Sequence, residues 1–276
     1  MYLITIVLYN KNPEDSSTIN SLSRLTTEIK NTLRIIVWDN SPMPFNDSQR
    51  NTLSNKLNGI NTIYRHNNGE NMPLSRIYNL TIKELQNNEC LVILDDDSEF
   101  DNQFFEKATT AILKHDDIDL FLPIVHTSDN IVSPAYMYLF KGHYFKSVKP
   151  GIMTTKNTTA INSGMIIRAR YLKHDFEGYD ENIKFYFTDN DFMSKYDASH
   201  QSLVVIDYHM HHTLNFYQRG EEFSKKKARF KDLRHSFLIL MRRKGIAVYL
   251  ITVLYMFIYS IKFAIIHKDI RYIFIR

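Results

Sequence analysis

Apolar runs of strand length alternate with amphipathic segments through the first half of the chain. Polar, turn-forming residues bound the predicted strands, and residues that can cap a helix precede the amphipathic segments. This order predicts an α/β fold with a mostly parallel, doubly wound sheet, in which ligands bind at the carboxyl ends of the strands. The predicted strands are 2–9, 33–38, 60–64, 90–94 and 118–125, and the predicted helices are 17–31, 72–86 and 101–115.

The alternation loosens beyond residue 127. Strand-like segments cover 131–140, 158–167 and 203–206, and an acidic helix is predicted near 189–199. The chain shows no internal repeat and no low-complexity linker. We therefore interpret this region as the second half of one domain that covers residues 1–218, followed by a basic and hydrophobic helical extension over 219–276.

Charge is divided unevenly between these two parts. Residues 1–218 carry 20 Lys and Arg against 26 Asp and Glu, whereas residues 219–276 carry 14 against 4. Such a split indicates that one end of the chain meets an anionic surface. Because the basic stretch 225–234 is followed by the apolar stretch 246–266, an anionic membrane is a simpler partner than nucleic acid.

The apolar stretch allows three interpretations. Its 21 residues are enough to cross a bilayer. Its Tyr, Thr and Ser residues make it amphipathic, and basic residues flank both ends, which suits a helix lying in the membrane interface equally well. It can also form a helix pair packed on the α/β domain. We favour membrane association, with the helix in the plane of the membrane.

Cysteine usage favours a reducing compartment. Cys90 is the single cysteine, which excludes an intramolecular disulfide framework and a zinc site with several cysteines. The apolar run 2–9 lacks the basic residues before it and the cleavage site after it that mark a secretory signal. We therefore expect a cytoplasmic protein.

Three carboxylates follow a predicted buried strand directly. Asp95, Asp96 and Asp97 come after Leu91–Leu94, at the carboxyl end of that strand. Alternation along an extended segment places Asp95 and Asp97 on one side, where two hard oxygen ligands can hold Mg²⁺ or Mn²⁺ against a diphosphate. The alternative is a solvated acidic turn that caps the helix starting near residue 101.

Polar residues follow other predicted strands in the same way. Asp39 ends the second strand, where a carboxylate can accept the imide N–H of a uracil or thymine base; the alternative is an ordinary turn. The polar loop 67–75 leads to a helix N-terminus that suits an anionic donor, and we assign Arg76 in that helix to the donor side. These positions belong to one edge of the predicted sheet.

Five segments occur in the order seen in family-2 glycosyltransferases of the GT-A fold, and residues 1–215 resemble that family. The Leu94–Ser98 segment resembles its DxD motif, in a form similar to that of bacterial rhamnosyltransferases, and Phe187–Phe192 resembles its second acidic motif. Residue 188 departs from the pattern, because Thr stands where many members have Glu. The other three segments are Thr5–Asn10, Val37–Pro42 and Asn162–Gly164.

The resemblance implies a role for each matched position. Asp95 would contact the donor ribose, Asp97 would bind the metal and Asp39 would hold the base, with Asn10 and Asp96 also on the donor side. A histidine past the strand 203–206 would help the metal or the leaving phosphate, and we choose His212, with His211 as the alternative. Ser163, Gly164 and Asp191 would lie on the acceptor side.

Asp189 is the expected general base. An inverting transfer needs one carboxylate that takes the proton of the acceptor hydroxyl as its oxygen attacks the anomeric carbon. The resemblance implies this role for Asp189, and the alternative is a helix N-terminal charge in an exposed position. A zinc site at His209, His211 and His212 is disfavoured, since alternation separates His212 from the other two and no Cys accompanies them.

These observations predict a metal-dependent, inverting glycosyltransferase at the cytoplasmic face of the bacterial inner membrane. The donor would be a dTDP- or UDP-linked sugar and the acceptor a lipid-linked glycan of O-antigen or capsule assembly. Rhamnose is the first expectation and galactofuranose or another hexose the second. The alternative of another class is a membrane-tethered, non-catalytic binder of glycans or sugar nucleotides. Nucleotidyl transfer is disfavoured because residues 8–13 contain no Gly.

Overall fold

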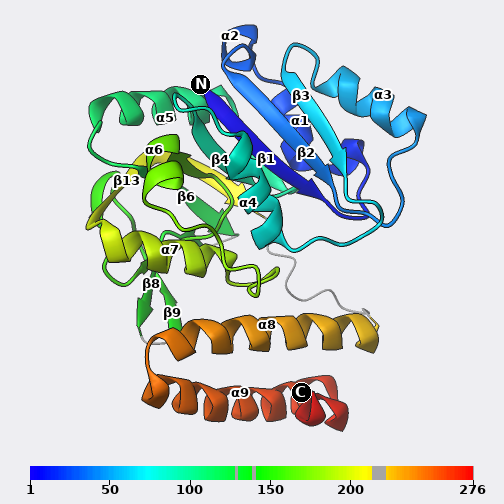
Figure 1. Cartoon of the computed structure of the whole chain (residues 1–276), viewed down its shortest axis with the longest axis vertical. Helices are drawn as coiled ribbons and strands as arrows, with labels where there is room; N and C mark the ends of the chain where they lie inside the picture. The colour runs from blue at the N-terminus through cyan, green and yellow to red at the C-terminus, as the bar shows by residue number, and fades with distance from the viewer. Residues whose placement is uncertain (128–129, 139–140, 213–221, 276) are drawn as a thin grey trace.

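The computed structural model of the chain describes residues 1–127, 130–138, 141–212 and 222–275. Its centre is a block of parallel strands in the order β4-β1-β2-β3 (Figure 1). Leu8 pairs with Asp39, and Asp39 pairs with His66, so the carboxyl ends of three strands lie level. The strands are β1 (Tyr2–Leu8), β2 (Leu33–Asp39), β3 (Asn61–His66) and β4 (Cys90–Leu94).

The second half of the chain completes the same sheet. β12 (Met165–Arg168) lies antiparallel between β4 and β6 (Leu120–Thr127), and β13 (Ser202–His212) is parallel to β6. The sheet is therefore mixed, and most of its strands run in the same direction, as the fold class predicts. Its remaining strands are β10 (Gly151–Thr154), β5 (Ser98–Glu99) and β7 (Asn130–Ser133), while β8 (Ala135–Tyr138), β9 (Lys141–Tyr144) and β11 (Thr158–Thr159) form a separate small sheet.

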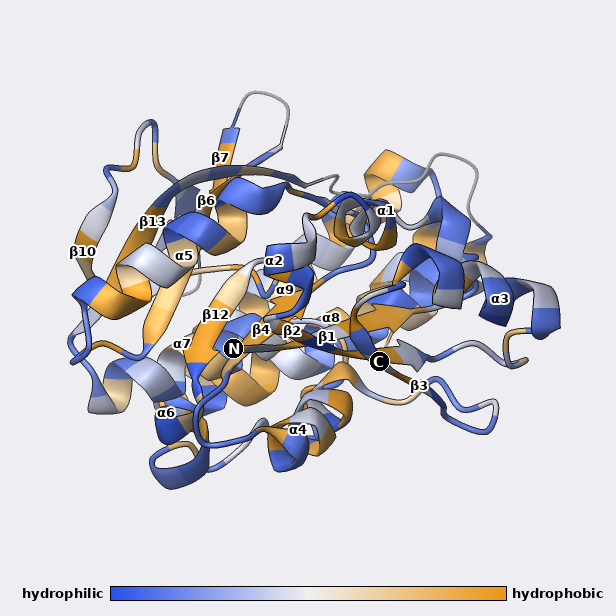
Figure 2. Cartoon of the chain, turned by 90° about the horizontal axis from the view of Figure 1, so that it is seen from above, coloured by the Kyte–Doolittle hydropathy of each residue, from blue (hydrophilic) through white to orange (hydrophobic). Residues whose placement is uncertain are grey.

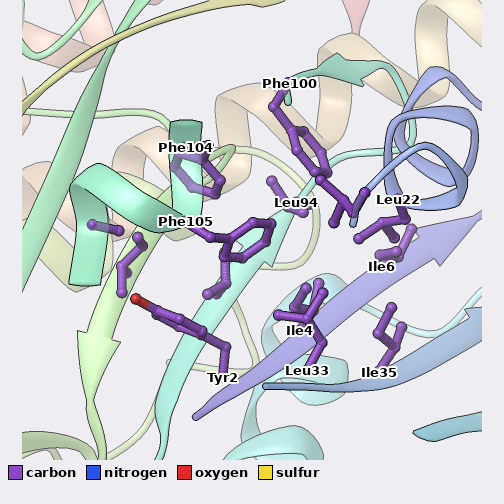
Figure 3. Close-up of a cluster of buried hydrophobic side chains, with 14 of the residues drawn as sticks. Tyr2, Ile4, Ile6, Leu22, Leu33, Ile35, Leu94, Phe100, Phe104 and Phe105 are labelled. Atoms are coloured by element: carbon purple, nitrogen blue, oxygen red, sulfur yellow. The ribbon is translucent and has the colours of Figure 1, made fainter. Parts of the chain in front are cut away.

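Helices cover both faces of the sheet, because alternate side chains of each strand point to opposite faces. Tyr2, Ile4 and Ile6 of β1 pack toward α1 (Ser17–Ser23) and α5 (Asn102–Lys114), where Phe104 and Phe105 meet them (Figure 3). Leu3 points to the other face. That face is covered by α4 (Leu74–Glu84), α6 (Ala169–His174) and α7 (Thr188–Ser199).

The colouring by hydropathy agrees with this layering. In Figure 2 the central strands are largely orange, whereas the helices outside them carry blue residues on their outer sides. Burial of apolar surface on both faces stabilises the sheet by about 25 cal/mol for each Å² removed from water. The two faces therefore form two hydrophobic clusters separated by the strands.

Several local predictions differ from the structure, among them the strand predicted at 158–167, which divides into β11 and β12. The helix predicted at 17–31 is interrupted, and α2 (Thr27–Lys30) is separate, because Thr26 is extended and its N–H donates to Asn102 Oδ1 at 3.0 Å. α3 (Asp47–Lys56) is missing from the prediction; it buries Leu53 alone and so lacks an amphipathic pattern. Its signal is the capping box between Asn46 and Gln49. The strand predicted at 131–140 divides into β7 and β8 at Pro134.

The extension forms a helical hairpin. α8 (Phe223–Arg243) turns at Gly245 into α9 (Ile246–His267), and the one-turn segment η2 (Ile270–Phe274) packs back on it. Gly245 has a φ of 111°, which favours glycine at this turn. Figure 1 shows α8 between α9 and the α/β domain. A third hydrophobic cluster joins the hairpin to Ile183 of that domain.

Candidate functional site

The loop of three aspartates after β4 is braced by the start of α1. Ser16 Oγ donates to the carbonyl of Asp96 at 2.7 Å, and Thr18 Oγ1 donates to the carbonyl of Asp95. The N–H of Ser98 donates back to Thr18 Oγ1 at 2.9 Å. These hydroxyls fix the backbone of the loop, so the directions of its carboxylates are set by the protein. The sequence predicts Ser16 only as a helix cap, and misses this second role.

Ser163 and Gly164 brace the same loop from the other side, and their predicted place beside the acceptor stays a prediction. Ser163 Oγ hydrogen bonds with Ser98 Oγ, and the N–H of Gly164 donates to the carbonyl of Ile93 at 2.8 Å. Gly164 has a φ of 84°, and a Cβ there would lie 2.6 Å from Pro123 Cγ. Both residues are buried, so their polar atoms serve the aspartate loop.

The carboxylates of this loop fit a divalent metal that also takes oxygens from a ligand. Lys11 Nζ lies 3.2 Å from Asp96 Oδ2, and the backbone of His212 pairs with Ser98, next to Asp97. The side chain of His212 lies outside the described residues. Within the described parts of the chain, no three His, Cys, Asp or Glu side chains form a metal site by themselves. Mg²⁺ is commonly held by one or two carboxylates plus substrate phosphates, and metal binding by Asp97 stays a prediction.

Asp189 lies in the first turn of α7, whose N-cap Phe187 has the left-handed φ of 66°. Burial raises the pKa of Asp189 to about 7, and the negative charge of Asp95 adds to this rise. The N–H of Asn190, which donates to the Asp189 carboxylate at 2.8 Å, lowers the pKa but does not cancel the rise. The effect of Asp95 shows that the carboxylates after β4 and at the start of α7 lie within electrostatic reach. A carboxylate with a pKa near 7 is well matched to general base chemistry at neutral pH.

Tyr78 and Tyr179 line the same region and were missed by the sequence analysis. Burial raises the pKa of Tyr78 well above its ordinary value, and the charges of Asp95 and Asp189 raise it further. Burial likewise raises the pKa of Tyr179, next to Asp191 and Asp189. Both phenols are therefore neutral and contribute uncharged walls near the carboxylates. No motif marks them: Tyr78 is one of the buried residues of α4, and Tyr179 lies in the segment between α6 and α7.

The predicted donor residues after β1 and β2 lie at the level carboxyl edge. Asp39 is buried, and its two oxygens accept from the N–H groups of Ser41 at 3.1 Å and Phe45 at 3.0 Å and from the Tyr64 hydroxyl at 2.7 Å. The contact of Asp39 with a base stays a prediction; the structure adds that this carboxylate holds the loop after β2. Asn10 is exposed, with its N–H donating to Ser41 Oγ at 2.9 Å.

Two further groups differ in their surroundings. Arg76 is exposed in the first turn of α4, and its donor contact stays a prediction. His209 Nδ1 lies 2.7 Å from His126 Nε2 of β6, and His211 stacks obliquely near the same ring. Burial and the two neighbouring histidines lower the pKa of His126. His209 and His211 therefore pair with His126 on the sheet, while the choice of His212 as a metal ligand stays a prediction.

Asp191 has a structural task that its predicted place on the acceptor side does not include, and that place stays a prediction. Its side chain is fully buried, and its oxygens accept from Arg243 Nη1 at 2.5 Å, from the N–H of Asp180 at 2.9 Å and from Lys195 Nζ at 3.1 Å. These three bonds hold the Asp191 carboxylate inside the protein. The pairing links α7 to α8, 52 residues further along the chain.

Known structures share this arrangement of elements. TarS of S. aureus superposes with a TM-score of 0.58 and 18% identity over 86% of this chain and 44% of TarS. The chain has the GT-A fold. GalNAc-T7 with UDP, GalNAc and Mn²⁺ gives 0.56 and 12% over 84% of this chain and 46% of that one.

The mannosyltransferase PcManGT of Pyrobaculum calidifontis, in complex with GDP-Man and Mn²⁺, superposes with a TM-score of 0.54 and 10% identity over 93% of this chain and 69% of that one. No family model and no curated protein matches the sequence. This chain spans less than half the length of TarS, and the likeness establishes the fold alone.

Asp189→Asn is expected to change how stability depends on pH. Between the ordinary Asp value of 3.8 and about 7, native Asp189 keeps a proton that the unfolded chain releases. This group therefore makes the free energy of unfolding fall as the pH rises through that range. The Asp189→Asn variant has no such pH-dependent loss. Its free energy of unfolding relative to the wild type, measured by urea unfolding, should therefore rise from about pH 4 to about pH 7 and stay level above pH 7.

Asp197→Asn, an exposed change at the other end of α7, provides the control. Its stability difference from the wild type should vary little over the same range. A difference for Asp189→Asn that is equally independent of pH would show that the pKa of Asp189 is not raised.

Proposed function

We propose that this chain is a metal-assisted, inverting glycosyltransferase that uses a nucleotide-diphosphate sugar. The observation that carries the proposal is the placement of Asp189, with its raised pKa, within electrostatic reach of the aspartate loop at the carboxyl edge of a GT-A sheet. TarS has been solved with UDP-GlcNAc, and two other neighbours with a nucleotide or nucleotide sugar and Mn²⁺, which supports the same class of ligand.

In the proposed reaction each group acts at a defined atom. Asp97, with His212, would hold a divalent cation that offsets charge on the leaving diphosphate. Asp95 would bind the donor ribose. A carboxylate oxygen of Asp189 takes the proton of the acceptor hydroxyl, whose oxygen forms the new bond to the anomeric carbon. The bond to the diphosphate breaks with its electrons going to the leaving oxygen, and single displacement inverts the anomeric centre.

The donor and acceptor follow from the resemblance noted in the sequence. We propose a dTDP- or UDP-linked donor, with rhamnose first and galactofuranose or another hexose second, and a lipid-linked glycan acceptor in cell-surface polysaccharide synthesis. A non-catalytic binder is the second candidate. Against it stands the raised pKa of Asp189, which binding alone does not require.

The hairpin supports a place at the membrane. The buried stripe of α9 consists of Thr252, Met256, Ser260 and Ala264. Thr252 Oγ1 and Ser260 Oγ each donate to the carbonyl four residues before them, at 2.8 and 2.9 Å. The exposed face of α9 is apolar, with only 22% of its most apolar window buried. A packed stripe that contains small and polar residues, opposite an exposed apolar face, is typical of helices in lipid. The apolar exposed residues include Leu250, Leu254, Phe257, Ile258, Ile265 and Ile266.

We therefore propose that residues 219–276 hold the catalytic domain, residues 1–218, at the cytoplasmic face of a bacterial inner membrane, with α9 in the plane of the anionic interface. The boundary between these parts lies outside the described residues. The parallel strands point their carboxyl ends toward the side of the molecule where α8 lies (Figure 1). That direction suits an acceptor carried by a lipid.

Purified protein incubated with Mg²⁺ or Mn²⁺ and a panel of sugar nucleotides should release nucleoside diphosphate from one donor class. Asp189→Asn should cut this turnover by about 10²-fold or more with little change in donor affinity, because a general base acts in the transition state. Asp197→Asn on the same helix should leave turnover unchanged. Wild-type turnover by Asp189→Asn would place the base elsewhere, and absence of turnover with every donor would favour the binder.

Asp97→Ala should abolish turnover, and excess chelator should do the same to the wild type, because a leaving diphosphate gathers charge that a cation offsets. Glu99→Gln, an exposed acidic change two residues away, is the matched control and should keep full activity. Undiminished turnover in chelator would contradict the metal role and favour a metal-independent transferase.

A variant with Gln at 250, 254, 257 and 258 should lose binding to vesicles of anionic phospholipid while it keeps donor turnover, because the change removes the exposed apolar face without a change in charge. Sedimentation with vesicles measures the binding. Gln at 225, 226 and 227 should remove mainly the part of the binding that salt screens. A wild-type chain that remains in solution with such vesicles would contradict the membrane proposal.

A further inference from the structure

The first turn of α7 receives two contacts from α8. The ring of Phe237 stacks on Phe187, with centroids 5.0 Å apart and planes 19° apart. Arg243, at the last residue of α8, reaches Asp191 on the same turn. Asp189 lies between Phe187 and Asp191 in sequence. The turn that carries the proposed base is therefore held on both sides by the hairpin.

The contact of Arg243 is a fork that joins two carboxylates. Its Nη1 lies 2.5 Å from Asp191 Oδ1, and its Nη2 donates to Asp180 Oδ2. Burial lowers the pKa of Arg243, but its bonds to Asp191 and Asp180 raise it more. Burial raises the pKa of Asp180, but its interactions with Asn182 and Arg243 lower it more. A planar guanidinium with two bonds fixes direction as well as distance.

Asp191 is the buried member of this arrangement. Its side chain has no exposed surface, whereas that of Arg243 is 39% exposed. Lys195, one turn along α7, is the other cation on its carboxylate. Loss of one partner of a buried ion pair leaves the other charge uncompensated, so the remaining carboxylate would pull toward solvent or Lys195. Such a shift turns the start of α7 and moves Asp189 with it.

We propose that Arg243 is a positioning residue for the Asp189 carboxylate, so that the hairpin also sets the geometry of the catalytic helix. Arg243 acts through Asp191 and does not contact substrate. This inference rests on the proposed function only for the kinetic part of its test. Arg243 thus serves the α/β domain through its bonds to Asp191 and Asp180, although it is one of the basic residues before the apolar stretch.

Arg243→Gln should lower kcat by about tenfold or more while the KM for the donor changes by less than about threefold, because the variant alters the geometry of the base and not the donor loops. Arg243→Lys, which keeps the charge but loses the fork, should recover part of kcat. Arg242→Gln is the matched control: it is exposed, lies one residue earlier and removes the same charge from the hairpin. It should leave kcat and KM unchanged.

A double variant separates positioning from stability. Asp191→Asn combined with Arg243→Gln removes both charges and should recover thermal stability relative to Arg243→Gln alone. If Arg243 positions the base, kcat stays low in the double variant although its stability recovers. Recovery of kcat together with stability, or equal kcat for Arg243→Gln and Arg242→Gln, would overturn the proposal.

A second readout does not need catalysis. The free energy of unfolding is compared between chains with Asp189 and chains with Asp189→Asn, as a function of pH. In the Arg243→Gln background the pH dependence of this difference should shift, because the surroundings of the Asp189 carboxylate change. An unshifted dependence would overturn the positioning role. If no donor turns over in the wild type, the proposed function fails, and this pH measurement alone decides whether Arg243 places the Asp189 carboxylate.

Discussion

Three carboxylates follow β4 at the carboxyl edge of the sheet, and the charge of one of them, Asp95, acts on the buried Asp189 at the start of α7. The surrounding structure bears the cost of holding these acidic groups. Burial is the main cause that raises the pKa of Asp189, and the negative charge of Asp95 raises it further. The protein offsets this cost with neutral donors and with a cation. Hydroxyls of α1 and Ser163 hold the loop backbone, and Lys11 meets Asp96. The neutral phenols of Tyr78 and Tyr179 add surfaces without charge.

The sheet could be predicted because its signals are local. The nearly continuous apolar runs of β1 and β4 indicate strands buried on both faces, and the position of Asp95 to Asp97 after β4 follows directly. The break between α1 and α2 could not be predicted, because it depends on the side chain of Asn102 in α5, which is 76 residues away from Thr26. α3 escapes a method based on hydrophobic periodicity, since it buries one apolar residue and is specified by its cap.

The site was predicted in the same uneven way. Residues that follow strands were found, because parallel strands bring their carboxyl ends together. Ser163, Gly164 and Asp191 were assigned to the acceptor from motif likeness, and the structure gives them bracing tasks. The bond between Asp191 and Arg243 joins two segments with no shared motif. Only the packing of α8 against α7 reveals it, and a sequence read segment by segment contains no signal for it.

The place of β12 has a consequence for how the molecule assembles. β12 lies antiparallel between β4 and β6, so these two strands are joined only through a segment that follows both of them in the chain. Until residues 165–168 have been synthesised, β4 and β6 each keep an unpaired edge. The turn that precedes β12 also carries Ser163, the brace of the aspartate loop. During synthesis, the strand that closes the sheet therefore arrives together with the residue that shapes the loop, and a half-made chain has neither.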